Sequence, residues 1–292
     1  MPELPEVETV RRGLALHMEG RTVTALELMR ADLRFPFPDG FAALMQDAEI
    51  VALTRRGKYL LAAMQKAGRS FYWLSHLGMT GRFMVAPAAG GSLEPGDYAH
   101  DIAAPVAVKH IHMRLTLSDG TRISYADPRR FGFMDVVMGT PESSPFLAQM
   151  GPEPLGNKFH VDGLLAACAG RKSPIKNTLL DQSVVAGLGN IYVCEALYDA
   201  RISPKRLAAN LGRKRAERLL PAIVGVLNRA IEAGGSSLRD FADSDGRMGY
   251  FQHQFWVYDR AGEACSRPEC HASIARIVQS GRSSFYCPSC QR

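Results

Sequence analysis

The sequence lacks several features that would mark whole classes of protein. It has no apolar run that approaches the roughly 18 residues of a membrane-spanning helix. Its first eight residues, Met-Pro-Glu-Leu-Pro-Glu-Val-Glu, are acidic, whereas a secretory signal is basic and then apolar. It also lacks internal repeats and low-complexity tracts, which excludes solenoid and fibrous architectures. These absences predict a cytoplasmic globular protein with no membrane partner, and nothing indicates an obligate protein partner.

Size and charge set broader bounds. The 292 residues, of which 46% are hydrophobic, can bury substantial cores and suggest one to three domains. The formal net charge is +6 and the isoelectric point is near 9.1. An excess of positive charge favours a polyanionic partner such as nucleic acid, although many proteins reach this value without one.

The first half of the chain predicts a β-sandwich with an N-terminal helix. Val7, Val10 and Leu14 recur at helical spacing, so residues 6–19 form one helix. Short alternating or apolar segments punctuated by glycine follow, and residues 118–120 read as a hairpin turn. Residues 87–105, rich in Ala, Gly and Pro, resemble a surface insertion. The strands are expected at 23–29, 49–53, 59–64, 70–77, 82–85, 111–117, 121–125 and 131–138, within a domain spanning 2–138.

A linker and a helical domain are expected next. Residues 139–157 contain four prolines and three glycines and show no periodicity, which is typical of a linker. Residues 158–253 then carry helical patterns, and residues 254–292 return to short strands around clustered cysteines. The helices are expected at 161–169, 174–180, 191–199 and 213–233, with a short one at 238–242.

Four of the six cysteines predict a metal site. Cys265 and Cys270 form one close pair and Cys287 and Cys290 another, separated by a hairpin-length segment. Tetrahedral Zn²⁺ takes four such ligands, and in a reducing cytosol clustered cysteines favour metal binding over disulfides. Since all four positions are filled by protein, we expect one structural Zn²⁺ in a zinc ribbon, with strands at 274–279 and 283–286. Unligated cysteines in a terminal tail are the alternative.

Pro2 is a candidate nucleophile at the N-terminus. Methionine before a small residue is normally removed, which would leave Pro2 with a free secondary amine. An α-amino group has an ordinary pKa of roughly 7.7 to 8.0, so part of it is neutral near pH 7 and able to attack an anomeric carbon. Glu3 and Glu6 could move the protons. A helix start alone also favours proline and acidic residues, so this pattern does not by itself establish catalysis.

Motifs along nearly the whole chain resemble those of the formamidopyrimidine-DNA glycosylases. The N-terminal segment Pro-Glu-Leu-Pro-Glu-Val-Glu-Thr matches, and further motifs follow in the family's order. The resemblance implies an α+β multidomain fold: an N-terminal β-sandwich with an N-terminal helix, a helix-two-turn-helix domain and a C-terminal zinc-ribbon β-hairpin. Many members of this family have two residues between the first two cysteines, whereas this chain has four between Cys265 and Cys270. The motifs are RGKYL (56–60), HLGMTG (76–81), DPRRFG (127–132), GPEPL (151–155), GLGNIY (187–192) and GR (281–282).

The resemblance assigns roles to individual residues. Pro2 becomes the nucleophile and Glu3 the proton donor, with Glu6 in support. Lys58 and Arg282 complete the catalytic set, Lys58 near the damaged nucleotide and Arg282 at a phosphate flanking it. His76 and Asn190 match the family's other contacts to these phosphates, which position DNA without reading its sequence.

A second group of matched residues implies how the lesion is reached. A damaged base must leave the stack before an enzyme can act on it, and side chains then fill the gap. Met79, Arg129 and Phe131 match the family's gap-filling residues, with Arg129 facing the estranged cytosine. Lys176 resembles a lysine that contacts the lesion, although Asn177-Thr178 stand where Pro and an aromatic residue are common. Residues 234–250 match the loop that closes over the extruded base.

The implied reaction is removal of oxidised purines from double-stranded DNA opposite cytosine, followed by β,δ-elimination through a Schiff base at Pro2. It requires no cofactor besides the structural Zn²⁺. One alternative is an endonuclease VIII-type glycosylase for oxidised pyrimidines. The endonuclease VIII-type enzymes, however, usually have Gly where this chain has Leu4. The other is a non-catalytic protein that binds damaged DNA.

Overall fold

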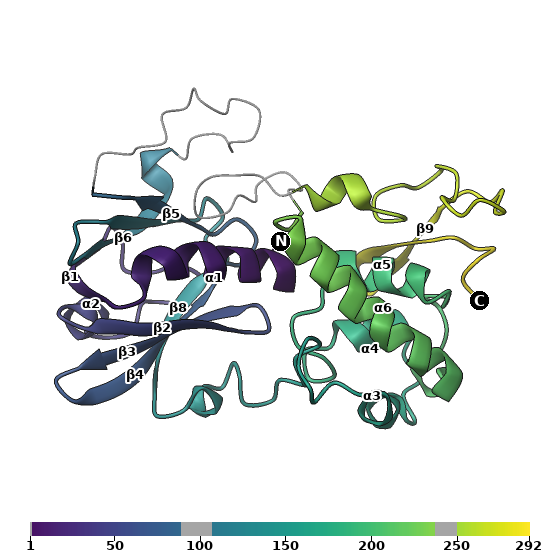
Figure 1. Ribbon diagram of the computed structural model, residues 1–292, viewed down its shortest axis with the longest axis horizontal. Coiled ribbons are helices and arrows are strands. Elements are labelled where there is room, and N and C mark those ends of the chain that lie inside the picture. Colours follow the sequence, from purple (N-terminus) through teal and green to yellow (C-terminus); the bar gives the residue numbers. More distant parts are fainter. Residues whose placement is uncertain (1, 89–106, 237–249) are drawn as a thin grey trace. The chain divides into compact units, whose positions relative to one another are not determined.

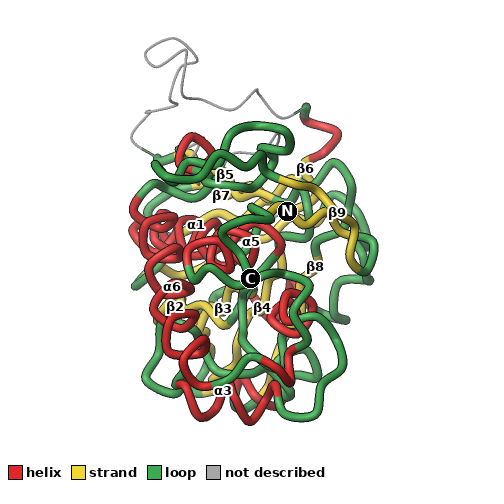
Figure 2. The backbone as a smooth tube through the Cα atoms, turned by 90° about the vertical axis from the view of Figure 1, so that its right-hand side faces the viewer, coloured by secondary structure: helices red, strands yellow, loops and turns green. Residues whose placement is uncertain are grey.

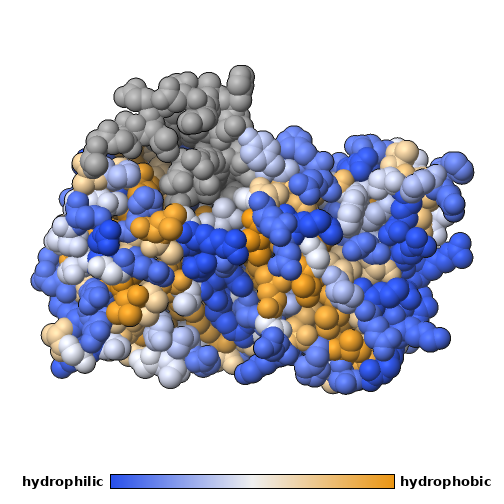
Figure 3. Space-filling view, viewed as in Figure 1, coloured by the Kyte–Doolittle hydropathy of each residue, from blue (hydrophilic) through white to orange (hydrophobic). Residues whose placement is uncertain are grey.

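The computed structural model describes residues 2–88, 107–236 and 250–292, and the chain divides into two compact units. The first contains residues 1–148 and 233–250, and the second contains residues 149–232 and 251–292. Among the described residues, no helix is both long and apolar enough to span a bilayer. Hydrophilic side chains cover most of the visible face, and apolar ones show in smaller groups (Figure 3).

The first unit consists of one hydrogen-bonded sheet that folds into a β-sandwich. The strand order is β5-β7-β6-β1-β2-β3-β4-β8, and every neighbouring pair is antiparallel. β1 and β2 pair only through Arg21 with Ile50 and Thr22 with Glu49, so the sheet can fold at this junction. The helices and strands are α1 (Leu4–Met18), β1 (Arg21–Leu28), α2 (Phe41–Met45), β2 (Glu49–Arg56), β3 (Tyr59–Lys66), β4 (Arg69–His76), β5 (Arg82–Ala86), β6 (Ile111–Leu117), β7 (Arg122–Ala126) and β8 (Phe133–Met138), with 3-10 turns at Val108–His110 and Pro141–Ser143.

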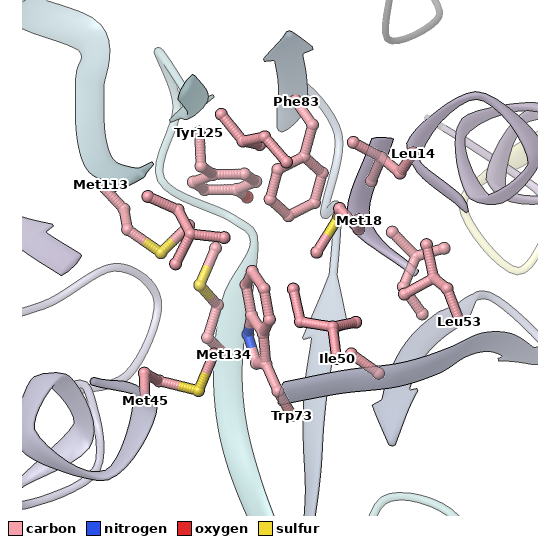
Figure 4. Close-up of a cluster of buried hydrophobic side chains, with 14 of the residues drawn as sticks. Leu14, Met18, Met45, Ile50, Leu53, Trp73, Phe83, Met113, Tyr125 and Met134 are labelled. Atoms are coloured by element: carbon pink, nitrogen blue, oxygen red, sulfur yellow. The ribbon is translucent and has the colours of Figure 1, made fainter. Parts of the chain in front are cut away.

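The sandwich core lies between the two halves of this sheet. The Trp73 ring of β4 contacts the Phe83 ring of β5, with centroids 6.1 Å apart, and Phe83 contacts Tyr125 of β7 at 5.0 Å. Figure 4 shows these rings together with Ile50 and Met134, directed toward one another. Burying such side chains stabilises a fold by about 1.5 to 3 kcal/mol each.

Helix α1 lies along the opening between the two layers (Figures 1 and 2). It contacts β2 and β3 on one side and β5 on the other. Its apolar positions Val7, Val10, Leu14 and Met18 are each 1% exposed and enter the sandwich core. Pro2 and Glu3, which directly precede the helix, are also buried.

The expected strands of this unit are all present, with boundaries that differ by up to three residues, and the N-terminal helix expected at 6–19 spans Leu4–Met18. Residues 118–120 form the predicted turn, in which the N–H of Gly120 donates to the carbonyl of Leu117. The expected strand 131–138 was too long, because β8 begins at Phe133 and Phe131 belongs to the preceding loop. The short helix α2 was not predicted, since five residues are too few to show periodicity.

The second unit contains the helices and a separate two-stranded ribbon. Its central helix is α5, in which residues 191–198 are all buried. Gln182 braces the turn before α5 because it accepts from the N–H of Gly187 and donates to the carbonyl of Leu188. The elements are α3 (Val161–Cys168), α4 (Ile175–Leu180), α5 (Asn190–Asp199), α6 (Arg213–Glu232), β9 (Ala275–Gln279) and β10 (Arg282–Tyr286), with 3-10 turns at Ala208–Asn210 and Phe251–Gln254.

A buried glutamate joins α5 to the segment that leads into the ribbon. Glu195 is fully buried, and its carboxylate accepts the backbone N–H groups of Trp256, Val257 and Tyr258 at 2.8 to 3.0 Å. Burial raises the pKa of Glu195, although these three donors oppose the shift. The ribbon is thus attached to the helices through a satisfied polar contact.

The helices of the second unit and the ribbon strands agree with the sequence prediction to within one residue at each end, apart from residues 238–242, which lie outside the described residues. The boundary between the two units falls after Ala148, inside the segment expected to be a linker. Residues 233–250 group with the first unit. The division into 2–138, 139–157, 158–253 and 254–292 stays a prediction.

Candidate active site and nucleic-acid interface

The start of α1 is buried and hydrogen-bonded at both of its glutamates. Pro2 is buried, and Glu3 is 2% exposed. The N–H of Glu3 donates to Oε2 of Glu6 at 2.8 Å. Oε1 of Glu6 accepts the N–H and the hydroxyl of Ser236, at 2.8 and 2.9 Å. One carboxylate therefore fixes the backbone next to Pro2 and also holds the chain at Ser236.

The approach of residues 235–236 to α1 requires glycine. Gly235 has φ +82°, and a Cβ built there would lie 3.1 Å from Cγ of Glu6 and 3.2 Å from its Oε1. A side chain at this position would be strained and would press on the carboxylate. The sequence singled out this loop as a whole, but not Gly235 or Ser236 individually.

Lys58 lies in the tight turn between β2 and β3, which is tied to α1 by charge. Glu8 of α1 accepts from Arg55 at 3.3 Å, and Arg55 donates to the carbonyl of Gly57 at 2.8 Å. Burial opposes ionisation of Glu8, but bonds from Arg11 and the other neighbouring arginines hold its pKa below the ordinary value. The helix that begins beside Pro2 and the turn that carries Lys58 thus share one ionic network.

His76 ends β4, opposite Tyr59 in the sheet register. Its Nδ1 accepts the N–H of Gly78 at 3.1 Å, so a neutral ring carries its proton on Nε2. Burial lowers the pKa of His76 to about 4, and the positive charges of Lys58 and Arg34 add to this effect. At neutral pH the ring is an uncharged hydrogen-bond donor, which suits contact with a phosphate oxygen without a buried cation.

A pocket of about 630 Å³ brings several of the predicted residues together. It is lined by His76, Met79, Arg129 and Phe131, and also by Arg34. Met79 and Phe131 are 36% and 42% exposed, and the Arg129 guanidinium lies 4.6 Å from the centroid of the Phe131 ring. An exposed apolar pair beside three arginines can contact stacked bases and phosphates together; the pocket is completed by Leu33, Gly78 and Arg130.

The fully buried carboxylate of Asp127 shapes the two loops that carry Met79, Arg129 and Phe131. One oxygen accepts the hydroxyl of Thr80, and the other accepts the N–H of Gly132 at 2.8 Å. Thr80 in turn accepts the N–H of Arg129 at 3.2 Å. In the sequence Asp127 is only the first residue of the DPRRFG motif, because only the folded chain shows that two separate loops bind it.

The backbones of these two loops touch. Gly78 has φ +63°, and a Cβ there would lie 2.3 Å from the backbone of Gly132 and Phe131. A Cβ on Gly132 would lie 2.0 Å from the Tyr125 hydroxyl. Both positions therefore require glycine, and the resulting close packing sets the spacing between Met79 and Phe131.

The second unit holds three more of the predicted residues around the ribbon turn. Lys176 is fully buried, and its Nζ donates to the carbonyl of Ser283 at 2.9 Å and to the hydroxyl of Ser284 at 2.6 Å. Asn190, at the start of α5, donates to the same carbonyl at 2.9 Å. Arg282 is exposed and directly precedes Ser283. The structure thus places Lys176, Asn190 and Arg282 together.

The four predicted zinc ligands also come together in the second unit. The sulfur atoms of Cys265, Cys270, Cys287 and Cys290 all lie within 4.8 Å of one another. Sγ of Cys265 is 4.0 Å from that of Cys290, and Sγ of Cys270 is 3.5 Å from that of Cys287. Sulfurs bound about 2.3 Å from a central Zn²⁺ lie about 3.8 Å apart, so these residues fit the ion. The longer spacing after Cys265 leaves the cluster intact.

The predicted residues therefore form separate groups within the two units. Pro2, Glu3, Glu6, Lys58, His76, Met79, Arg129 and Phe131 belong to the first unit, and Lys176, Asn190, Arg282 and the four cysteines belong to the second. No sequence signal indicated Arg34 or Gln182, and the sequence assigned Asp127 and Ser236 no role beyond their place in a motif and a loop.

Comparison with known families covers most of the chain. Residues 1–134 match the formamidopyrimidine-DNA glycosylase N-terminal domain, and residues 150–242 match the formamidopyrimidine-DNA glycosylase H2TH domain. The formamidopyrimidine-DNA glycosylase of Ruegeria pomeroyi is 52% identical over the full length of both chains.

Solved structures are similar as well. A Lactococcus lactis Fpg mutant bound to DNA containing Fapy-dG matches with a TM-score of 0.83 and 34% identity, covering 100% of both chains. The complex of Lactococcus lactis Fpg with DNA containing an abasic site matches with a TM-score of 0.82 and 33% identity, covering 99% of both chains. The likeness thus extends from the sandwich to the ribbon.

The shifted pKa of His76 predicts a pH dependence of stability. Between pH 6.5 and about 4 the unfolded chain protonates this histidine while the folded chain does not, so the free energy of unfolding falls as the pH falls through this window. His76→Gln removes the titration. In thermal melts of DNA-free protein, the variant should lose less stability than wild type between pH 7 and pH 5. An equal loss in both proteins would show that His76 titrates normally.

The cysteine cluster predicts one zinc per chain. Cys290→Ser should reduce bound zinc well below one equivalent and weaken DNA binding, because the ribbon loses its metal support. Cys168→Ala is the matched control, since Cys168 is buried in α3 and does not belong to the cluster. Atomic absorption and DNA titration measure both effects. Purified wild type without zinc would contradict the assignment.

Proposed function

The chain belongs to the formamidopyrimidine-DNA glycosylase family and is a bifunctional DNA glycosylase and AP lyase of base-excision repair, and from this premise we propose its substrate and mechanism. It removes 8-oxoguanine and formamidopyrimidines paired with cytosine in duplex DNA. It then cleaves the abasic strand by β,δ-elimination and leaves a one-nucleotide gap. The Lactococcus lactis relative was crystallised with DNA containing Fapy-dG, which supports this substrate class.

The fixed, buried start of α1 is the observation that carries the proposal. Removal of Met1 would make the nitrogen of Pro2 a secondary amine beside Glu3 and Glu6. Burial of Pro2 favours the neutral, nucleophilic form of the amine, whereas the neighbouring carboxylates favour its charged form. The bonds of Glu6 to Glu3 and Ser236 hold the adjacent backbone, so the amine does not have to be ordered at the moment of attack.

The proposed reaction begins with attack on the sugar. The lone pair of the Pro2 nitrogen forms a bond to C1′, the bond from C1′ to the base breaks, and the departing base takes up a proton. The nitrogen then loses its proton and the bond from C1′ to the ring oxygen breaks, giving an iminium. Glu3 donates the proton that this oxygen requires, which is the task of a general acid.

Elimination follows from the iminium. Because the cation withdraws electrons, the C2′ proton becomes acidic; its removal breaks the C3′–O bond and expels one phosphate. Removal of the C4′ proton then breaks the C5′–O bond and expels the other phosphate. Lys58 and Arg282 neutralise charge on the phosphates as they leave, as basic residues near developing negative charge can do.

The remaining predicted residues hold the DNA. His76, as a neutral donor, and Asn190 contact phosphates that flank the lesion. Met79 and Phe131 fill the gap left by the extruded nucleotide, and Arg129 donates to acceptors on the estranged cytosine. Since the bacterial Lactococcus lactis relative was crystallised with damaged DNA, we place the protein in the cytoplasm with the nucleoid.

Borohydride trapping tests the mechanism with a matched pair of proteins. One carries an uncleaved N-terminal extension, which turns the Pro2 nitrogen into an amide, and the other carries the same extension at its C-terminus. On a duplex with 8-oxoguanine opposite cytosine, the second protein should form a covalent adduct and the first should not, because an amide nitrogen is not nucleophilic.

The same assay separates the alternatives. Stronger trapping on duplexes with oxidised pyrimidines would indicate an endonuclease VIII-type enzyme. No adduct from a protein with a verified free Pro2 would indicate a non-catalytic damage binder. Equal trapping by both extended proteins would overturn the role of Pro2.

The proposed role of Arg129 predicts that this residue sets the preference for cytosine opposite the lesion. Arg129→Ala should reduce the preference for cytosine over adenine opposite the lesion by about 5-fold to 150-fold, corresponding to the roughly 1 to 3 kcal/mol of one base contact. Arg34→Ala removes the same charge from the same pocket and should weaken binding without changing the preference. Excision rates on the two duplexes measure the effect, and unchanged selectivity in Arg129→Ala would contradict the assignment.

A further inference from the structure

The surroundings of Lys176 differ from those of a lysine that contacts DNA. Its side chain is fully buried, and its ammonium group donates to the carbonyl of Ser283 and the hydroxyl of Ser284 on β10. Ser284 is also fully buried and donates to Gln279 on the partner strand at 2.7 Å. Burying a cation is costly unless protein groups replace its water, and here the ribbon supplies acceptors.

Two asparagines attach to the same part of the ribbon. Asn190 of α5 shares the Ser283 carbonyl with Lys176, at 2.9 Å. Asn177 of α4 donates to the hydroxyl of Ser280 at 2.8 Å. Ser280 has φ +46° and forms the turn with Gly281, so Asn177 bonds to the tip of the hairpin itself. Three side chains from the starts of α4 and α5 therefore bond to residues 280–284.

Arg282 lies within residues 280–284, the segment that Lys176, Asn177 and Asn190 clamp through hydrogen bonds. Alternate residues of a strand point to the same face, so Arg282 leaves β10 on the side of Ser284, which is the side that receives the Lys176 ammonium. Arg282 is exposed, while its neighbours in the strand are anchored. The backbone on which the guanidinium stands is thus fixed, although its side chain is free to reach a ligand.

We infer that Lys176 and Asn177 are positioning residues that set the orientation of Arg282 through the ribbon turn, rather than contacts to the damaged base. The inference rests on the role of Arg282 in the proposed function. The cysteine cluster holds the opposite end of the hairpin, so metal and clamp together fix both ends of β9 and β10. Because the turn is already ordered, DNA binding does not incur the entropic cost of ordering it.

A double-mutant cycle tests this coupling. Lys176→Met removes the donor at similar length, and Arg282→Ala removes the proposed phosphate contact. Each single variant should slow trapping on the duplex containing 8-oxoguanine opposite cytosine by roughly tenfold or more. If Lys176 acts through Arg282, the double variant should be no slower than Arg282→Ala alone. Lys176→Met should also divide its effect between KM and kcat in the same proportion as Arg282→Ala.

Control variants separate positioning from folding and from charge. Lys158→Met removes one positive charge from an exposed position and should have little effect. Asn177→Ala should show a smaller slowing that also disappears in the Arg282→Ala background. Zinc content and melting temperature, measured on every variant, report whether the ribbon is intact. A variant that loses zinc is replaced in the cycle by Ser284→Ala, which deletes the hydroxyl that accepts from Lys176 and donates to Gln279.

Each outcome decides a different point. Effects of Lys176→Met and Arg282→Ala that multiply in the double variant would overturn the clamp and favour direct contact between Lys176 and DNA. No slowing by Lys176→Met in a protein slowed by Arg282→Ala would also overturn it. No slowing by Arg282→Ala would instead refute the proposed role of Arg282, on which the inference depends.

Discussion

The carboxylate of Glu6 is the constraint on which the proposed chemistry depends. It is almost completely buried, accepts the N–H of Glu3, and accepts both the N–H and the hydroxyl of Ser236. A buried carboxylate with satisfied oxygens is rigid, because moving it would leave several donors unpaired. Pro2 directly precedes Glu3, whose N–H is bound by the Glu6 carboxylate, so the position of the nucleophilic nitrogen follows from the fold.

The same principle recurs at the other sites. Asp127 joins the loops that carry Met79 and Phe131, Glu195 joins α5 to the segment before the ribbon, and Lys176 joins α4 to β10. In each case a buried ionisable side chain bonds to groups of another segment and thereby joins the two segments. Low solvent access strengthens these bonds and makes their loss costly.

Sequence patterns predicted the elements of the fold and the chemistry of the site, but not these anchors. Helical spacing located α1 and α6, and two cysteine pairs located the ribbon, because each signal is local. These buried side chains bond to residues far away in the chain, as Glu6 does to Ser236. A periodic pattern in the sequence reports only local structure and cannot predict such a contact. For the same reason the sequence motif suggested only a lesion contact for Lys176 and did not show its bonds to Ser283 and Ser284.

The central claim is that Pro2 carries the covalent bond to the sugar, and peptide mass spectrometry of the borohydride-trapped complex tests it most directly. After digestion of protein and DNA, the account predicts a reduced sugar remnant on the nitrogen of an N-terminal peptide that begins at Pro2, with Met1 absent. A remnant on a lysine such as Lys58, or an adduct formed by protein that retains Met1, would contradict the account.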